Sequence, residues 1–209
     1  MAQRPHLTEE DAARIAAVVG KAEQQTSAEI RIVVTESPLV ARSHYVGLWA
    51  ALVALVAPWL AVFVVPVSSV RLLAAQGAVF VVAWALFSLP PVARRLVPLR
   101  QKRIAARTLA HQMFLAHGVH RTGAQTGVLI LVAPHDRLVE VIADEAAHKA
   151  LGTGTWEDIC NAISGPSAEG KLADGVVAGV ELAARLLAGP LPAQPGDRNE
   201  LPDAPISPG

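Results

Sequence analysis

Residues 45–93 read YVGLWAALVALVAPWLAVFVVPVSSV, then Arg71, then LLAAQGAVFVVAWALFSLPPVA, and Arg71 is the single charged residue among them. A helix of about 20 residues spans roughly 30 Å, the thickness of a bilayer's hydrocarbon core. Each half is long enough, and neither shows the polar spacing of a helix packed on a soluble core. The remaining residues are too few to bury a hairpin of this size inside a soluble bundle. We therefore predict a transmembrane helical hairpin, with helices at about 46–65 and 71–89.

Basic residues gather where the second half of the hairpin ends, although the whole chain is balanced at 18 basic and 18 acidic residues. The set is Arg94, Arg95, Arg100, Lys102, Arg103 and Arg107. Positive charge beside a membrane span is typical of the cytoplasmic side. The balanced total charge, and the lack of aromatic residues among these positions, argue against nucleic acid as a partner. We predict a multi-pass protein of the inner (cytoplasmic) membrane, with both soluble parts in the cytoplasm.

The same six basic residues have two interpretations. Arginine and lysine near an anionic leaflet each contribute about 1 kcal/mol of attraction to lipid headgroups. They could equally serve only to orient the hairpin, and the two roles do not exclude each other. The first residues of the chain contain no apolar segment typical of a cleavable signal peptide, which agrees with the cytoplasmic orientation.

The soluble segments alternate helices and strands. Thr8 begins a capping box and an amphipathic helix that ends near Gln25. Strands are predicted at 29–35, 127–133 and 138–143, and a turn at 134–137 joins the last two. Further helices are predicted at 101–117, at 145–151, from a capping box at Thr155 to about Ser164, and at 172–187, with Gly118 ending the first of these.

This order predicts a layered α/β domain that the membrane hairpin interrupts. Residues 1–36 form its first part, residues 45–93 the hairpin, and residues 98–188 its second part. Both parts must lie on one side of the membrane to meet. Residues 189–209 are rich in proline, so we predict a disordered tail, with a short docking element at 199–202 as an alternative.

The soluble segments resemble the TPM-domain family in its membrane-inserted bacterial form. The resemblance rests on TSAEIRIVV at 26–34, on TGAQTGVLILVAPHDRLVEVIAD at 122–144, and on a closing helix after KLADGV at 171–176. It covers about 8–35 and 98–188. It implies an α/β sandwich, and it implies calcium binding or acid phosphatase activity, as reported for some relatives.

The resemblance also points to candidate metal ligands. Asp144, Glu145 and Asp174 supply the carboxylate oxygens that hard cations prefer. Metal-binding relatives have an Asp-Asn-Gly-like step before the central strand, whereas this chain has Gln125-Thr126-Gly127 there, without a carboxylate. Asp144 and Asp174 also precede helices, where an acid caps free N–H groups. A divalent cation such as calcium is thus a possible cofactor on a weak site, and no other cofactor is indicated.

Other polar residues give weaker indications. His117 and His120 could form a metal pair, with the distant His148 as a third ligand, but surface or capping roles fit them better. Cys160 is predicted to be a small buried residue and not a reactive thiol. Gly175 and Gly179 predict a close helix approach, by packing on the sheet more than by dimerisation.

We expect a membrane-anchored, non-enzymatic TPM-like domain that binds an unknown protein partner or supports a membrane complex at the inner leaflet. The first alternative is a divalent-metal-dependent phosphatase that uses Asp144, Glu145 and Asp174. The second alternative is an anionic-lipid-binding module. Inside the predicted spans Gln76 is the only amide and no acid is present, which argues against a transporter or channel.

Overall fold

The structure is a computed structural model, in which residues 7–62, 68–194 and 199–208 are described. Within it the chain divides into two compact units. The first unit contains Met1–Leu39 and Arg103–Gly209, and the second contains Val40–Lys102.

A mixed three-stranded sheet organises the first unit. Its strands are β1 (Ile30–Val34), β2 (Val128–Ala133) and β3 (Leu138–Ala143), in the order β1-β2-β3. β1 pairs with β2 in parallel, and β2 pairs with β3 in antiparallel register. All three strands predicted from the sequence are present. Because β1 precedes the apolar insertion and β2 follows it, the sheet is assembled from both sides of that insertion.

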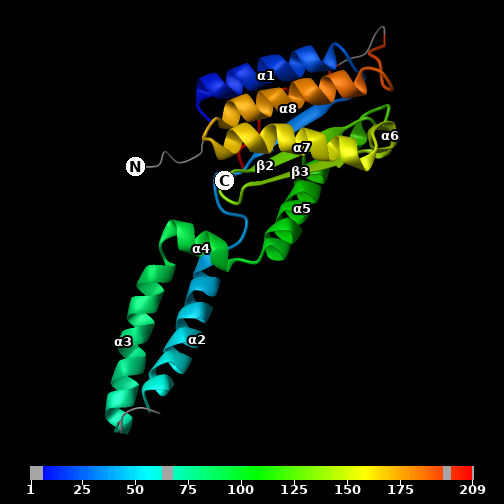
Figure 1. Ribbon diagram of the computed structural model, residues 1–209. Helices are drawn as coiled ribbons and strands as arrows, with labels where there is room; N and C mark the ends of the chain where they lie inside the picture. The colour runs from blue at the N-terminus through cyan, green and yellow to red at the C-terminus, as the bar shows by residue number, and fades with distance from the viewer. Residues whose placement is uncertain (1–6, 63–67, 195–198, 209) are drawn as a thin grey trace. The chain divides into compact units, whose positions relative to one another are not determined.

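Helices cover both faces of this sheet. They are α1 (Glu9–Glu23), α5 (Leu99–Ala116, within this unit from Arg103), the 3₁₀ turn η1 (Val119–Arg121), α6 (Glu145–Ala150), α7 (Thr153–Ala168) and α8 (Leu172–Leu187). Figure 1 shows α1, α7 and α8 on one face and α5 on the other. The mixed α/β class predicted from the sequence is therefore confirmed.

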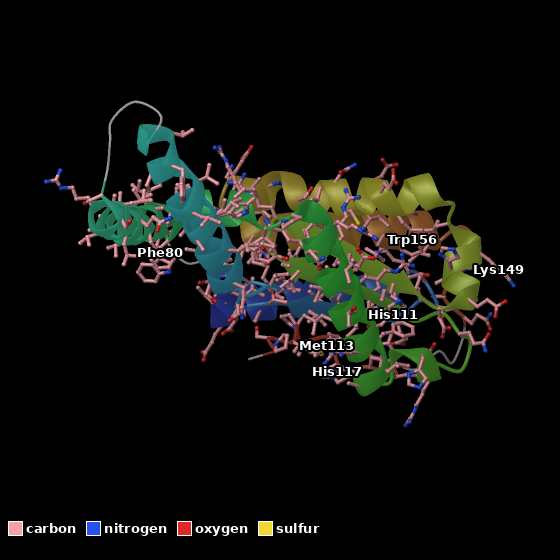
Figure 2. The ribbon with its side chains drawn as sticks, turned by 90° about the horizontal axis from the view of Figure 1, so that it is seen from below. Phe80, His111, Met113, His117, Lys149 and Trp156 are labelled. Atoms are coloured by element: carbon pink, nitrogen blue, oxygen red, sulfur yellow. The ribbon has the colours of Figure 1, made fainter. Side chains whose placement is uncertain are left out.

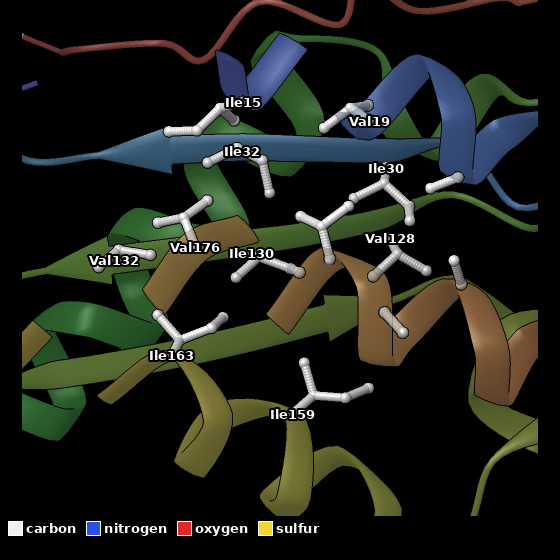
Figure 3. Close-up of a cluster of buried hydrophobic side chains, with 14 of the residues drawn as sticks. Ile15, Val19, Ile30, Ile32, Val128, Ile130, Val132, Ile159, Ile163 and Val176 are labelled. Atoms are coloured by element: carbon white, nitrogen blue, oxygen red, sulfur yellow. The ribbon is translucent and has the colours of Figure 1, made fainter. Parts of the chain in front are cut away.

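The main hydrophobic core lies between the sheet and the three-helix layer (Figure 3). Branched side chains of alternate strand positions, such as Ile30, Ile32 and Ile130, meet Ile15 of α1 and Ile159 of α7. A second, smaller cluster joins the other sheet face to α5. Since both faces of β2 are buried, its uninterrupted apolar sequence is explained.

Local signals placed several helix ends correctly. Thr8 caps α1: its hydroxyl accepts the Asp11 N–H at 3.1 Å, and the Asp11 carboxylate accepts the Thr8 N–H at 3.1 Å. Gly118 follows α5 with φ of 69°, a left-handed conformation that ends a helix readily at glycine.

The predicted start and end of α7 were wrong. The helix begins at Thr153 with Gly152 as its N-cap, so Thr155 lies inside the first turn and does not cap it. The helix also continues through Pro166 to Ala168, beyond the end predicted near Ser164. Tertiary packing explains the extension, because Ile163 is fully buried against α8 and holds the last turns in place.

The glycine pair of α8 allows a close approach, but its partner is α7 and not the sheet. A Cβ on Gly175 would lie 2.4 Å from the Ile163 carbonyl oxygen, and a Cβ on Gly179 would lie 2.2 Å from Ile163 Cγ1. Neither position has room for a methyl group. The two glycines therefore set the distance between the two helices.

The second unit contains α2 (Arg42–Val62), α3 (Ser69–Phe87) and α4 (Pro90–Leu96). α2 and α3 are each long and apolar enough to cross a membrane. They bury small residues such as Ala50 and Ala83 and leave most large side chains exposed. The sequence did not predict α4, which begins at two prolines because the first turn of a helix needs no intrahelical N–H donors. Residues 63–67, at the expected inter-helix turn, lie outside the described residues.

Residues 199–208, which we name the strap, differ from the disordered tail expected from the sequence. Ile206 forms a parallel bridge with Val33 of β1: its N–H donates to the Ile32 carbonyl at 2.9 Å, and its carbonyl accepts the Val34 N–H at 2.8 Å. Leu201 and Ile206 pack against the α5-side cluster. Burial of these two side chains, together with the main-chain hydrogen bonds, offsets the entropy of ordering a proline-rich segment. Residues 195–198 and 209 of the expected tail lie outside the described residues.

Candidate functional site

Two of the three predicted metal ligands lie together at the start of α6. Asp144 is the N-cap, and its Oδ1 accepts the Glu145 N–H at 3.0 Å. Its Oδ2 is buried without a hydrogen-bond partner among the described residues. Glu145 instead pairs with Lys149 at 2.5 Å, and this hydrogen bond lowers the pKa of the fully exposed Glu145 carboxyl. Figure 2 shows Lys149 on α6.

The third predicted ligand, Asp174, lies apart from the other two. It belongs to the first turn of α8 and forms an ion pair with Arg14 of α1 at 2.7 Å. α7 starts beside α6, and its 16 residues span about 24 Å before α8 begins. Within the described residues no group of three or more His, Cys, Asp or Glu side chains is placed to hold a metal ion. The structure therefore does not assemble the predicted three-acid site.

The histidines do not gather either. His117 lies near the end of α5 (Figure 2), where burial and the nearby charge of Arg31 lower its pKa. The His120 ring packs on Phe114, with 6.3 Å between ring centroids. His148 belongs to α6. Cys160 of α7 is partly buried, and burial with Glu140 and Glu157 raises its pKa to about 11, so its thiol is protonated at neutral pH.

One member of the predicted lipid-headgroup set is buried. Lys102 is 8% exposed, and its Nζ donates to the Arg94 carbonyl at 2.8 Å. This contact ties the start of α5 to α4, so the Lys102 ammonium serves packing and is not free to meet a headgroup. The Arg94 Nε in turn donates to the Pro90 carbonyl at 3.3 Å.

Arg94 and Arg95 belong to α4, and the remaining three basic residues form an exposed stripe along α5. Arg100, Arg103 and Arg107 are exposed and recur at helical spacing on one side of the helix. Ile104, which is 51% exposed, lies on the same side. An exposed stripe of arginines with an apolar residue among them suits the interface between lipid headgroups and acyl chains.

A further polar cluster, which the sequence analysis missed, lies where the strap meets α1 and β1. A pocket of about 410 Å³ is lined there by residues that include Glu23, Glu29, Asn199 and Asp203. The Glu23 Oε1 accepts the Ile30 N–H at 3.0 Å. Burial, partly opposed by that hydrogen bond and reinforced by Glu29 and Asp203, raises the pKa of Glu23 to about 8. This carboxyl therefore holds a proton near neutral pH.

Two charged residues complete the cluster: Glu29, directly before β1, and Arg31 within it. The Glu29 carboxylate accepts the N–H groups of Glu200 and Leu201, each at 3.3 Å. Arg31 is 7% exposed, and its Nε and Nη1 have no hydrogen-bond partner among the described residues. Burial lowers the pKa of Arg31, while Asp203 and Glu23 oppose that shift. The available sequence signal was the pair of charges, Glu29 and Arg31, on one side of a strand.

Comparison with known proteins finds a matching family and a similar solved structure. Residues 96–186 match the TPM domain. The matched segment runs from the end of α4 through most of α8, and α1 and β1, which precede it, complete the same sheet and core. The TPM resemblance inferred from the sequence is confirmed for this segment.

A solved structure has the same fold. The BA42 protein from the psychrophilic bacterium Bizionia argentinensis, determined by NMR, is similar with a TM-score of 0.61. The two chains are 20% identical, and the similarity covers 99% of each. Among curated proteins no significant match to this chain is found.

Proposed function

We propose that this protein is a non-enzymatic membrane anchor for a TPM domain. In this proposal α2 and α3 cross the bacterial inner membrane as a hairpin. The first unit then lies at the cytoplasmic face, where it binds a protein partner or supports a membrane complex.

The exposed apolar surface of α2 and α3 is the observation that carries the proposal. Only 22% of the first candidate span and 6% of the second are buried. A core helix of a soluble protein of the same composition would be mostly buried. Large side chains along both helices are instead open, among them Leu48, Leu52, Leu55, Trp59, Leu73, Phe80, Val81 and Trp84. Such a surface is stable in lipid and costly in water.

The topology follows from chain order and charge. The sheet of the first unit uses strands from both sides of the hairpin, so both flanks must lie in one compartment. The exposed arginines that follow the hairpin favour the cytoplasm.

Reporter fusions test this topology. A fluorescent protein fused after Gly209 is expected to fold and emit light in the bacterial host, whereas an alkaline phosphatase fused there is expected to be inactive. The reason is that the first needs the cytoplasm to mature and the second needs the oxidising periplasm. The reverse pattern would overturn the proposed orientation, and release of the full chain by alkaline carbonate would overturn the anchoring itself.

The three acids of the phosphatase alternative each have another role in the structure. The phosphatase alternative needs Asp144, Glu145 and Asp174 around one cation. Asp144 caps α6, Glu145 pairs with Lys149, and Asp174 pairs with Arg14 on another helix. Each acid thus has a structural partner, and the three do not converge.

The arginine stripe of α5 supports a second role, which is contact with anionic lipid. Arg100, Arg103 and Arg107 are exposed and follow the second candidate span closely in the sequence. Each is worth about 1 kcal/mol against an anionic leaflet. Lys102 is omitted because its ammonium is buried.

Thiol labelling of the full chain in nanodiscs measures this lipid contact. In a Cys160→Ala background, a cysteine introduced by Ile104→Cys is expected to react with maleimide about five-fold more slowly in anionic than in neutral lipid. The triple change Arg100→Glu, Arg103→Glu, Arg107→Glu should abolish the difference. A cysteine introduced by Ala13→Cys, exposed on α1, is the control and should react equally in both lipids. Equal rates at position 104 in both lipids would contradict the lipid role.

A further inference from the structure

The strap occupies the open edge of β1 through few contacts. A single bridge at Ile206 supplies the two main-chain hydrogen bonds described above. The Glu200 carboxylate adds one contact, in which its Oε2 accepts the Gly123 N–H at 3.0 Å. An edge strand with unpaired N–H and C=O groups is the part of a sheet that most readily accepts another segment. The strap therefore covers an edge of the sheet that could accept another segment, and few main-chain hydrogen bonds hold the strap there.

A pair of carboxyl groups fastens the middle of the strap to α1. The Asp203 side chain lies so close to Gly20 that a Cβ there would be 2.7 Å from Asp203 Oδ2. Asn199 Nδ2 donates to Asp203 Oδ1 at 2.5 Å. The Glu23 carboxyl of α1 lines the same pocket as the Asp203 carboxyl, and its Oε2 is buried without a hydrogen-bond partner among the described residues. Two carboxyl groups can share a hydrogen bond only when one of them carries a proton.

We propose that the strap is a proton-dependent latch, docked on β1 when the Glu23–Asp203 pair holds a proton and released when that proton is lost. The proposal is independent of membrane anchoring, because all the groups involved belong to the first unit.

The charges around the pair explain why a single proton matters. α1 contributes Glu23, and the strap contributes Asp203 and Glu200. Arg31 belongs to β1, and Glu29 directly precedes that strand. His117 of α5 lies near Arg31, and its pKa is lowered, which favours the neutral form. Arg31 is then the one cation among the groups named here, and four of them are acids. Loss of the Glu23 proton adds a negative charge beside Asp203 and Glu29, and it removes the proton that the Glu23 and Asp203 carboxyl groups could share.

The direction of the pH dependence follows from the raised pKa of Glu23. Its ordinary value is 4.5, and its value with the strap docked is about 8. Undocking exposes Glu23 to water and removes Asp203, so the released form holds the proton less tightly. Docking is therefore strongest at low pH, weakens as pH rises toward 8, and reaches its minimum above 8. Release frees the edge groups of Ile32 and Val34 and uncovers apolar side chains beneath Leu201 and Ile206.

Hydrogen exchange of the full chain in nanodiscs tests the latch. Protection factors of the strap amides, corrected for intrinsic exchange, are compared at pH 6 and pH 9. We expect at least a ten-fold loss of protection in the wild type at pH 9. The β2 amides at 128–133 should keep their protection, which shows that the unit itself stays folded.

The variant Glu23→Gln distinguishes release of the strap by loss of the Glu23 proton from a general loss of structure at high pH. Its side-chain amide can donate to Asp203 at every pH, and its carbonyl still accepts the Ile30 N–H, so strap protection should be equal at pH 6 and pH 9. Glu10→Gln, exposed in the first turn of α1, is the matched control and should behave as the wild type. If the β2 amides lose protection in Glu23→Gln, the protection of the strap amides is measured in Asp203→Asn instead. The proposal would be overturned if the wild-type strap amides were equally protected at pH 6 and pH 9. It would also be overturned if a folded Glu23→Gln variant lost as much strap protection at pH 9 as the wild type.

Discussion

Gly175→Ala is expected to lower the free energy of unfolding of the first unit by about 3 kcal/mol, the upper part of the range for overpacked cores. The added Cβ would lie 2.4 Å from the Ile163 carbonyl oxygen and 2.7 Å from Ser167 Oγ. The first of these is a backbone atom, so it moves only if α7 moves away from α8. Alanine improves helix propensity by about 1 kcal/mol over glycine, and the steric cost must exceed that gain.

Chemical denaturation of the full chain in detergent, followed by the fluorescence of Trp156, measures this effect. Trp156 is in the core between α7 and the sheet, so its fluorescence reports on the packing of that core. The tryptophans of the hairpin are first replaced by phenylalanine, so that only Trp156 is observed. Gly165→Ala in α7 is the matched control, because a Cβ there meets nothing within 4 Å. It should stabilise the unit by up to about 1 kcal/mol. Equal effects of the two substitutions would mean that the α7–α8 spacing is not set by glycine.

Ala78→Arg is expected to prevent stable membrane integration of much of the protein. Ala78 is exposed near the middle of α3, where the proposed function places the centre of the bilayer. Arginine at the centre of a span costs about 2.5–3.5 kcal/mol on insertion scales, and no acid in either candidate span is available to pair with it. The fraction that resists alkaline carbonate extraction measures the effect.

The control for this experiment is Ala17→Arg, an equivalent change at an exposed position of α1. It should leave the membrane fraction unchanged, because α1 belongs to the first unit. If Ala78→Arg also left that fraction unchanged, α3 would not be a membrane span and the proposed anchoring would fail.

Local patterns predicted the secondary structure well wherever the signal is carried by neighbouring residues. The Thr8 capping box, the turn after residue 133 and the glycine at 118 act over four residues or fewer, and all appear as predicted. The end of α7 differs from the prediction because Ile163 packs against Gly175 and Gly179 of α8, a tertiary contact that no local signal reveals. The Pro-Pro start of α4 gives no periodic apolar signal, and the helix has seven residues, too few for a pattern to indicate it.

The distances between the candidate site residues could not be predicted, because the sequence shows the types of the residues but not which of them meet in the fold. Asp144 and Asp174 are acids at helix starts, and the sequence alone does not show that α7 separates them. Lys102 looks identical to its arginine neighbours until its contact with the Arg94 carbonyl is known. The carboxyl pair of Glu23 and Asp203 joins residues from α1 and the strap, which no motif connects.

The sequence by itself determined the α/β class, the apolar hairpin and the interruption of one domain by that hairpin. These depend on periodicity, on run length and on element order, all of which are properties of the chain read in one dimension. Only the tertiary structure decided that the acids of the predicted metal site stay apart, that Lys102 is buried, and that residues 199–208 cover the edge of β1. Burial, and with it the charge state of a group such as Glu23, depends on what the folded chain brings within a few ångströms, and sequence separation does not measure that distance.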